Sequence, residues 1–155
     1  MLSGSTPTSA ATPEQLLERF VKGNPRQRRP LIKTVEARAS DLVALGSAVI
    51  EPFKSSGCDW AAGWILQVLN RHDPNHVKTL IAPYGQGWLQ VESSVGIDYS
   101  ELQALLLNED FEEADRRTSA ILRDLAGPAA VRRGYVYFSE VPPMPGIDLV
   151  SLDRL

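Results

Sequence analysis

The sequence predicts an all-α protein, in which an N-terminal helical stack of the HEAT-like bundle type is followed by a smaller all-α core. Two observations predict this class. Apolar residues recur every three or four positions along most of the 155-residue chain, as they do on the buried face of a helix. The segments with this period are short, and each is bounded by helix-capping residues, Gly or Pro. A composition of 43% hydrophobic and 23% charged residues is typical of a soluble globular protein.

The first helix of the stack has a clear start signal. Thr12 is a helix-capping residue, Pro13 occupies the first helical position, and Gln15 stands three positions after the cap. This pattern is a capping box. Pro25 and Pro30 are expected to interrupt the chain after this helix, with the second helix beginning near Pro30. The remaining helices of the stack are expected to begin at Ser40 and Asp41, at Asp59, and at Asp73-Pro74.

The helix that begins at Asp59 is predicted to be central to the stack. Its apolar residues, which cover nearly half of its circumference, are Trp60, Ala61, Trp64, Ile65, Val68 and Leu69. A helix with so broad an apolar face is buried between neighbours on two sides.

The second half of the chain carries its own start and stop signals. Asp98 to Glu101 reads as an N-cap box, Asp110 begins the next helix, and Gly127-Pro128 ends it. An aromatic segment at 135–138 follows, bounded by glycine and prolines, and Asp148 is expected to cap a last helix. We therefore divide the chain into a disordered tail at 1–11, an N-terminal helical bundle at 12–82, a linker at 83–95 and a core at 96–155.

Charge and residue content argue against several functions. A net charge of -3 disfavours a protein whose main task is to bind nucleic acid. Cys58 is the only cysteine, so no disulfide framework exists, and neither a phosphate-binding glycine loop nor a catalytic triad pattern is found. His72 and His76 are separated by Pro74, which disfavours a shared metal site. We expect no catalytic residues, no metal site and no enzyme activity.

Two local features remain open from the residues alone. The basic residues Arg26, Arg28, Arg29 and Lys33 either meet an acidic partner or anionic lipid, or are simply solvated. Cys58 lies beside an expected helix N-terminus, where a thiolate is favoured, but no suitable base stands near it in the sequence.

Four motifs in the second half resemble one known family. They are Gly96-Ile97-Asp98-Tyr99, Asp110-Phe111-Glu112-x-Ala114-Asp115, Leu125-Ala126-Gly127-Pro128 and Tyr137-Phe138-x-Glu140-Val141. With them, residues 96–155 resemble the genomes-uncoupled four family, whose members are porphyrin-binding regulators of magnesium chelatase. Residues 12–82 resemble more loosely the helical N-terminal extension of cyanobacterial members.

The resemblance implies a tetrapyrrole-binding regulatory protein of chlorophyll biosynthesis. The implied ligand is protoporphyrin IX or Mg-protoporphyrin IX, and the implied partner is the large porphyrin-binding subunit of magnesium chelatase. The implied protein is a cytoplasmic monomer, at most peripheral to thylakoid membranes. A ligand-free helical protein-interaction module is the alternative.

A tetrapyrrole site needs an apolar wall with cations at its rim, which face the propionates. The resemblance places the wall at Val131, Tyr137, Phe138 and Val141, with Met144 as an adaptable contact. Arg132 and Arg133 are the candidate cations. The alternative for these residues is that the aromatics are core anchors and the arginines belong to a solvated loop.

The family's core continues beyond the helix with which this sequence ends, through an aromatic and basic stretch that supplies much of the porphyrin site. We therefore expect the chain to be either a fragment or a short natural form, with weakened porphyrin binding.

Overall fold

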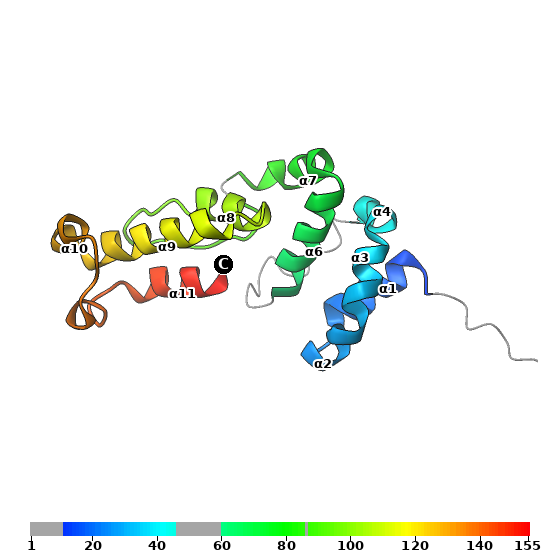
Figure 1. The fold of residues 1–155 in the computed structure, drawn as a ribbon, viewed down its shortest axis with the longest axis horizontal. Coiled ribbons are helices and arrows are strands. Elements are labelled where there is room, and N and C mark those ends of the chain that lie inside the picture. Colours follow the sequence, from blue (N-terminus) through cyan, green and yellow to red (C-terminus); the bar gives the residue numbers. More distant parts are fainter. Residues whose placement is uncertain (1–10, 46–59, 86) are drawn as a thin grey trace, which may run out of the picture.

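The computed structural model of the protein describes residues 11–45, 60–85 and 87–155. Every regular element within these ranges is an α-helix or a 3-10 helix, so the all-α prediction is confirmed. The described chain is elongated (Figure 1): residues 13–45 form one end, residues 60–84 the middle, and residues 100–154 extend to the other end. The expectations for Cys58 and Asp59, and for residues 1–10 of the tail, fall outside the described residues.

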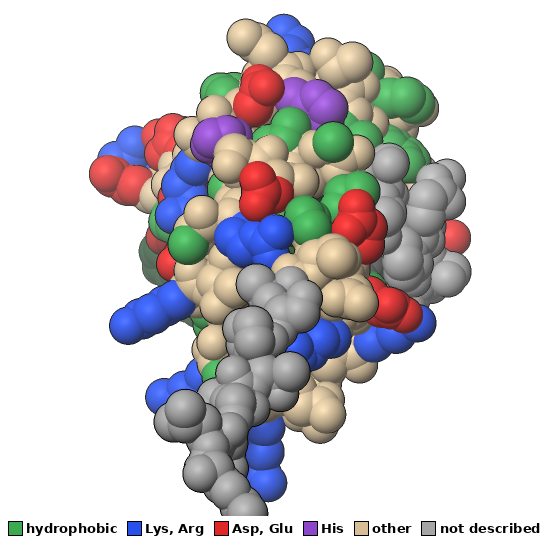
Figure 2. Space-filling model, turned by 90° about the vertical axis from the view of Figure 1, so that its right-hand side faces the viewer, with side chains coloured by type: hydrophobic (Ala, Val, Ile, Leu, Met, Phe, Trp, Pro, Cys, Tyr) green, Lys and Arg blue, Asp and Glu red, His purple; other side chains and the backbone are tan. Residues whose placement is uncertain are grey.

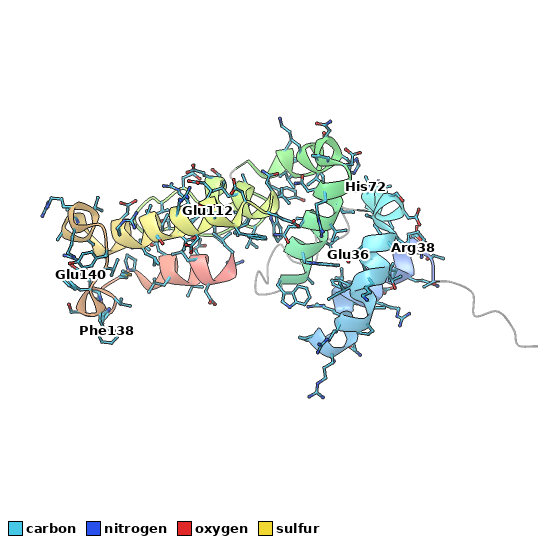
Figure 3. All side chains as sticks on the ribbon, viewed as in Figure 1. Glu36, Arg38, His72, Glu112, Phe138 and Glu140 are labelled. Carbon is cyan, nitrogen blue, oxygen red and sulfur yellow. The ribbon has the colours of Figure 1, made fainter. Side chains whose placement is uncertain are left out.

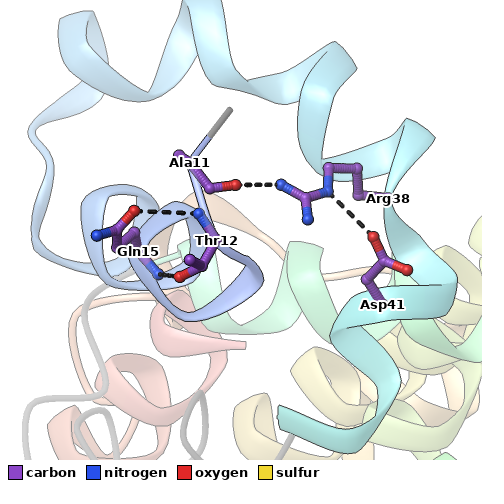
Figure 4. A network of polar contacts seen from close by, with 5 residues as sticks. All are labelled: Ala11, Thr12, Gln15, Arg38 and Asp41. Carbon is purple, nitrogen blue, oxygen red and sulfur yellow. Dashed lines mark hydrogen bonds and ion pairs between the residues drawn. The ribbon is translucent and has the colours of Figure 1, made fainter. Parts of the chain in front are cut away.

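The first helix, α1 (Pro13–Lys22), begins with the predicted capping box. The Gln15 N–H donates to Thr12 Oγ1 at 3.3 Å, and the Thr12 N–H donates to Gln15 Oε1 at 3.0 Å. Figure 4 shows this box beside Arg38, which donates from Nη1 to the Ala11 carbonyl at 2.5 Å and from Nε to Asp41 at 3.1 Å. Arg38 therefore ties the start of α1 to a segment 27 residues away.

Pro25 begins a helix instead of interrupting the chain, which corrects the sequence prediction. The short helix α2 (Pro25–Arg28) has a capping box of its own, between Asn24 and Gln27. Pro is well tolerated here because the first helical position needs no N–H. A 3-10 turn, η1 (Arg29–Leu31), follows, and α3 (Ile32–Ala37) begins close to the predicted Pro30.

The prediction that Ser40 and Asp41 cap a third helix is wrong. Both lie inside α4 (Ala39–Leu42), whose N-cap is Arg38. Arg38 alone separates α4 from α3, and its φ of -111° and ψ of 21° are not extended. A side-chain cap forms most readily on an extended N-cap residue, so this junction leaves no place for one. The 3-10 turn η2 (Val43–Leu45) follows α4.

The helix α6 (Trp60–His72) is central, as predicted. Its fully or nearly buried residues are Ala61, Ala62, Ile65, Leu66, Val68 and Leu69. It packs against α1, α4, α7 (Pro74–Ile81) and α8 (Ser100–Leu107). Asp73 caps α7, as predicted, because its Oδ1 accepts a hydrogen bond from the His76 N–H at 3.0 Å. The 3-10 turn η3 (Ala82–Tyr84) ends this part of the chain.

The C-terminal half contains α8, α9 (Phe111–Ala126), α10 (Pro128–Arg133), η4 (Phe138–Glu140) and α11 (Gly146–Arg154). Asp110 caps α9, as predicted, by accepting from the Glu113 N–H at 3.4 Å. The expected N-cap box of α8 is not formed. Tyr99 is its N-cap residue, and Asp98 accepts from the Ser100 N–H at 2.9 Å in a tighter turn. A second apolar cluster around Tyr99, Leu102, Ala114 and Ile121 joins these helices.

Three polar residues on one face of α6 hold the carbonyl end of α8. They are Gln67, Asn70 and Arg71. Asn70 and Arg71 follow Gln67 by three and four residues, so they lie on the same side of the helix as Gln67. Their contacts are Gln67 Nε2 to the Leu106 carbonyl at 2.7 Å, Asn70 Nδ2 to the Leu107 carbonyl at 3.3 Å, and Arg71 Nε to Glu109 at 3.2 Å. The last carbonyls of a helix need partners from outside that helix, and α6 supplies two of them.

The segment at 87–94, within the predicted linker, packs on the C-terminal helices. Gln103 is buried, its Nε2 donates to the Leu89 carbonyl at 2.8 Å, and its Oε1 accepts from the Leu89 N–H at 3.1 Å. The Glu92 N–H donates to Ser151 Oγ at 3.2 Å. The division of the chain into domains stays a prediction.

Candidate functional site

The aromatic segment lies at the end of the molecule farthest from α1 (Figure 1). We call residues 128–145 the tip. Gly127 has a φ of +104° and Gly134 a φ of +88°, a backbone region that residues with a side chain rarely adopt. These two glycines end α9 and α10, and they turn the chain so that α11 runs back beside α9.

Arg133 fixes the shape of the tip. Its Nη2 donates to Glu140 Oε2 at 2.6 Å and to the Tyr135 carbonyl at 3.0 Å. Its guanidinium carbon lies 3.9 Å from the centre of the Tyr137 ring and 4.8 Å from that of Tyr135. Glu140 Oε2 also accepts from the Tyr137 N–H at 2.8 Å. One cation and one carboxylate therefore hold both tyrosines and the start of η4.

The two tyrosines also contact each other. Their rings meet edge to face with centroids 5.3 Å apart, and their hydroxyl oxygens are 3.3 Å apart. The hydrogen bond to Tyr137 is the main reason that the pKa of the Tyr135 hydroxyl is raised. Both rings remain about half exposed, so the pair forms part of the surface.

The apolar side chains of the tip face outward. Phe138 is 90% exposed, and Val131, Tyr137 and Val141 are each about half exposed. Figure 3 shows Phe138 projecting from the end of the molecule, with Glu140 on the inner side of the same turn. Met144, in contrast, is buried. Exposed large apolar groups that cluster at one place are typical of a binding surface.

Asp148 anchors the helix that leaves the tip. It is fully buried, its Oδ1 accepts from the Tyr99 hydroxyl at 2.9 Å, and its Oδ2 accepts from the Ser94 N–H at 3.0 Å and the Ser94 hydroxyl at 2.7 Å. Burial raises the pKa of this carboxyl, but hydrogen bonds from serines and Tyr99 outweigh burial and hold the pKa below its ordinary value. The prediction that Asp148 caps α11 is wrong, because the helix begins two residues earlier, at Gly146.

The sequence pattern of the GUN4-like family matches residues 92–155. Residues 92–155 belong to the GUN4-like family. The match begins at Glu92, which the structure ties to α11 through Ser151. The tip, Asp148 and its partners from residue 94 onward therefore all belong to the GUN4-like domain.

Three relatives extend this result. A Ycf53-like protein of Synechocystis is 38% identical over 96 residues, which are 61% of this chain and 41% of that protein. A chloroplastic protein of Arabidopsis thaliana, named a tetrapyrrole-binding protein, is 42% identical over 57 residues, 37% of this chain and 22% of that protein. An uncharacterized ycf53 protein of Pyropia yezoensis is 32% identical over 89 residues, 57% of this chain and 38% of that protein. The chain thus spans about two fifths or less of each relative.

The residues that the sequence predicted for the ligand site all lie in the tip, and they differ in their exposure and partners. Arg132 is exposed and has no ion pair among the described residues, whereas Arg133 forms an ion pair with Glu140. Of the predicted apolar contacts, Val131, Tyr137, Phe138 and Val141 lie on the surface and Met144 lies beneath it. Their assignment to a ligand stays a prediction.

Sequence reasoning missed two carboxylates that shape this domain. Glu140 was noted only as a letter of a family motif, and Asp148 was interpreted as a helix cap. A signal for Glu140 existed, because Arg133 and Glu140 flank a short aromatic loop. No local signal marks Asp148, whose partners are 49 and 54 residues away.

Outside the GUN4-like domain, the histidines do not form a site. His72 ends α6 and His76 lies in α7. Within the described ranges, no group of three or more His, Cys, Asp or Glu residues is placed to hold a metal ion. His72 instead lines an open cleft of about 420 Å³ with Glu36, Ala39, Val68 and Arg71. None of the described helices is both long and apolar enough to cross a bilayer.

Proposed function

We propose that the GUN4-like domain binds a tetrapyrrole at the tip, and that the protein is a regulatory, non-catalytic partner of magnesium chelatase. The observation that carries this proposal is the nearly complete exposure of Phe138 in a GUN4-like domain. The name of the Arabidopsis relative, a tetrapyrrole-binding protein, supports the ligand class. The proposed ligand is protoporphyrin IX or Mg-protoporphyrin IX.

The tip offers the apolar surface that a flat macrocycle needs. Val131, Tyr137, Phe138 and Val141 are all exposed within eleven positions of the sequence. Burial of roughly 300 Å² of porphyrin against such side chains contributes on the order of 7 kcal/mol before the costs of association. The costs of association take up much of this gross figure, so we expect binding to be weak, in line with the expectation from the sequence.

The two arginines would serve the ligand in different ways. Arg132 is exposed and lacks an ion pair in the described part of the chain, so it would face a propionate as a forked donor. Arg133 is held by Glu140 at 2.6 Å and would keep the tyrosines in place. Met144, which is buried, would support the tip from below.

The family also suggests a wider regulatory role, which we propose together with tetrapyrrole binding. The protein would engage the large porphyrin-binding subunit of magnesium chelatase and promote metal insertion without performing it. It would act as a monomer in a cytoplasmic setting, at most peripheral to thylakoid membranes.

The proposal is tested by titrating deuteroporphyrin into the full chain and following the Soret band. We expect a shift and a saturable curve for the native sequence. Phe138→Ala should raise the dissociation constant about tenfold, because the most exposed aromatic side chain of the proposed wall is removed. Arg132→Gln should weaken the binding of porphyrins that carry propionates more than that of an esterified porphyrin.

Phe111→Ala is the matched control. Phe111 is 58% exposed at the start of α9, and the 16 residues of that helix place it roughly 20 Å from the tip. An equal loss of affinity in both Phe variants, or no Soret shift at tens of micromolar ligand, would contradict the proposal.

The alternative function, a ligand-free interaction module, is favoured by one observation. Ile147 and Val150 are exposed one turn apart on α11, where a partner helix could cover them. A chain that bound the chelatase subunit without porphyrin, and lost this binding with Ile147→Asp, would support the alternative.

A further inference from the structure

Cations concentrate at the end of the molecule opposite the tip. Residues 12–33 hold six of the sixteen Lys and Arg residues but only two of the nineteen Asp and Glu residues. The rest of the chain is therefore strongly acidic. Figure 2 views this end and shows Lys and Arg side chains gathered in its lower half.

Most of these cations lack an internal partner. Lys22 pairs with Glu18 at 2.6 Å, and Arg28 is buried against α1. No ion pair is formed within the described ranges by Arg19, Arg26, Arg29 or Lys33. Several arginines elsewhere, among them Arg38, Arg71 and Arg116, are paired with carboxylates. The basic end thus carries positive charge that the fold itself does not neutralise.

A hollow lies between α1 and α2 beside these cations. We call it the basic groove; it has a volume of about 260 Å³ and is lined by Arg19, Lys22, Gly23, Gln27 and Leu31. Its lining combines the charged side chains of Arg19 and Lys22 and the amide of Gln27 with the apolar side chain of Leu31. The groove therefore offers Arg19, which forms no ion pair within the described ranges, Lys22, which shares its charge with Glu18 at 2.6 Å, one amide and one apolar contact.

The groove is built into the fold. Arg28 is 4% exposed, and its Nε and Nη2 donate at 2.8 Å to the carbonyls of Phe20 and Val21. These bonds hold α2 against the carbonyl end of α1. At the turn, a Cβ on Gly23 would lie 2.8 Å from the Arg19 carbonyl oxygen of α1, so the path of the chain out of α1 requires glycine there. A preformed site loses little ordering entropy on binding.

We propose that the basic groove docks an acidic polypeptide segment, with carboxylates facing Arg19 and Lys22 and an apolar side chain on Leu31. This surface is distinct from the tip and would serve a protein partner. The concave shape between two helices admits a single chain, whereas a flat bilayer would meet only the outermost cations. A nucleic acid duplex would extend over the acidic remainder of the molecule and be repelled.

The test uses the full chain and a short fluorescein-labelled peptide that has two Glu residues for every Leu, with a Gln-for-Glu peptide as the probe control. Fluorescence anisotropy should show saturable binding of the acidic peptide that weakens as salt is raised. Amide NMR shifts should concentrate in residues 19–31. Double substitution of Arg19→Gln with Lys22→Gln should weaken binding at least about tenfold.

The matched control is Lys78→Gln with Arg123→Gln, which removes the same charge from α7 and α9. It should leave peptide affinity within about twofold. An equal loss of peptide affinity in both double variants would overturn the proposal that the peptide binds in the basic groove. Binding would then depend on net charge alone. Vesicles containing phosphatidylserine and a duplex DNA are tested in parallel. Binding of either in place of the peptide, or no peptide binding at low salt, would also overturn the proposal.

Discussion

The hydroxyl of Tyr99 donates a 2.9 Å hydrogen bond to the carboxylate of Asp148, which lies 49 residues later in the chain. The other oxygen of Asp148 accepts both the N–H and the hydroxyl of Ser94. One buried carboxylate thereby joins the segment before α8, the start of α8 and the first turn of α11. Because α11 leaves the tip, this contact fixes the position of the helix that follows the tip.

Replacement of Asp148 should destabilise the C-terminal half. We expect Asp148→Asn to lower the free energy of unfolding by about 2 to 4 kcal/mol, because charge-assisted hydrogen bonds are lost and an amide hydrogen is left facing donors. Urea unfolding followed by circular dichroism measures this change. Asp153→Asn, on the exposed side of α11, should change it by less than about 0.5 kcal/mol. Similar losses in both variants would contradict the role of the buried carboxylate.

The same carboxylate should make stability depend on acid. Hydrogen bonds hold the pKa of Asp148 below its ordinary value of 3.8, despite the opposing effect of burial. A group with a lowered folded-state pKa stabilises the fold above its unfolded-state pKa, and this stabilisation is lost as the pH falls through the folded-state pKa. Unfolding free energies measured between pH 6 and pH 2 should therefore fall below about pH 4, and fall less steeply in Asp148→Asn. Parallel curves for the two proteins would show that other carboxylates dominate.

Gln103 should be essential for the position of the segment that follows η3. Its amide makes both hydrogen bonds to the backbone of Leu89, and it is buried. Gln103→Leu removes both and leaves a buried N–H and carbonyl without partners, at a cost of about 2 to 4 kcal/mol. Hydrogen exchange of the Leu89 amide should also accelerate. Unchanged exchange at Leu89 would mean that the segment is held by other contacts.

A buried arginine and an exposed one should differ in their importance. Arg28→Met should cost about 2 to 4 kcal/mol, because two carbonyls at the end of α1 lose their donors. Arg71→Met should cost less than about 1 kcal/mol, since the Arg71 side chain is half exposed and its pairs with Glu36 and Glu109 are screened by water. Thermal unfolding of the two variants measures the difference. A larger loss of stability for Arg71→Met than for Arg28→Met would contradict this prediction. It would mean that the ion pairs of Arg71 with Glu36 and Glu109 stabilise the fold more than the hydrogen bonds of Arg28.

Local signals predicted much of the helical fold. Thr12, Asp73 and Asp110 cap helices as expected because an N-cap bond closes within three residues. The same reasoning failed at Ser40, Pro25 and Asp148. In the first two cases, short helices follow one another with too little chain between them for the expected turn. In the third, a carboxylate with strong capping propensity had better donors in a distant segment.

The candidate site was predicted as a set of residues but not as an arrangement. The family motifs located the aromatic segment, yet the sequence could not distinguish Arg132 from its neighbour. In the structure, Arg133 forms an ion pair with Glu140 and lies over the Tyr137 ring, whereas Phe138 is almost wholly exposed. The pairing depends on a loop that brings residues seven positions apart into contact, and helical periodicity carries no information about such a loop.

The sequence by itself determined the all-α class, the central helix that carries Trp60 to Leu69 and the GUN4-like character of the second half. Periodic apolar residues, capping patterns and family motifs each lie within a short stretch of chain, so the sequence alone can reveal them. The tertiary structure alone decided that Asp148 is a buried acceptor, that α6 holds the end of α8, and that α1 and α2 enclose a basic groove. Each of these depends on which segments fold against one another, because a buried polar group must find its partner wherever the packed chain supplies one.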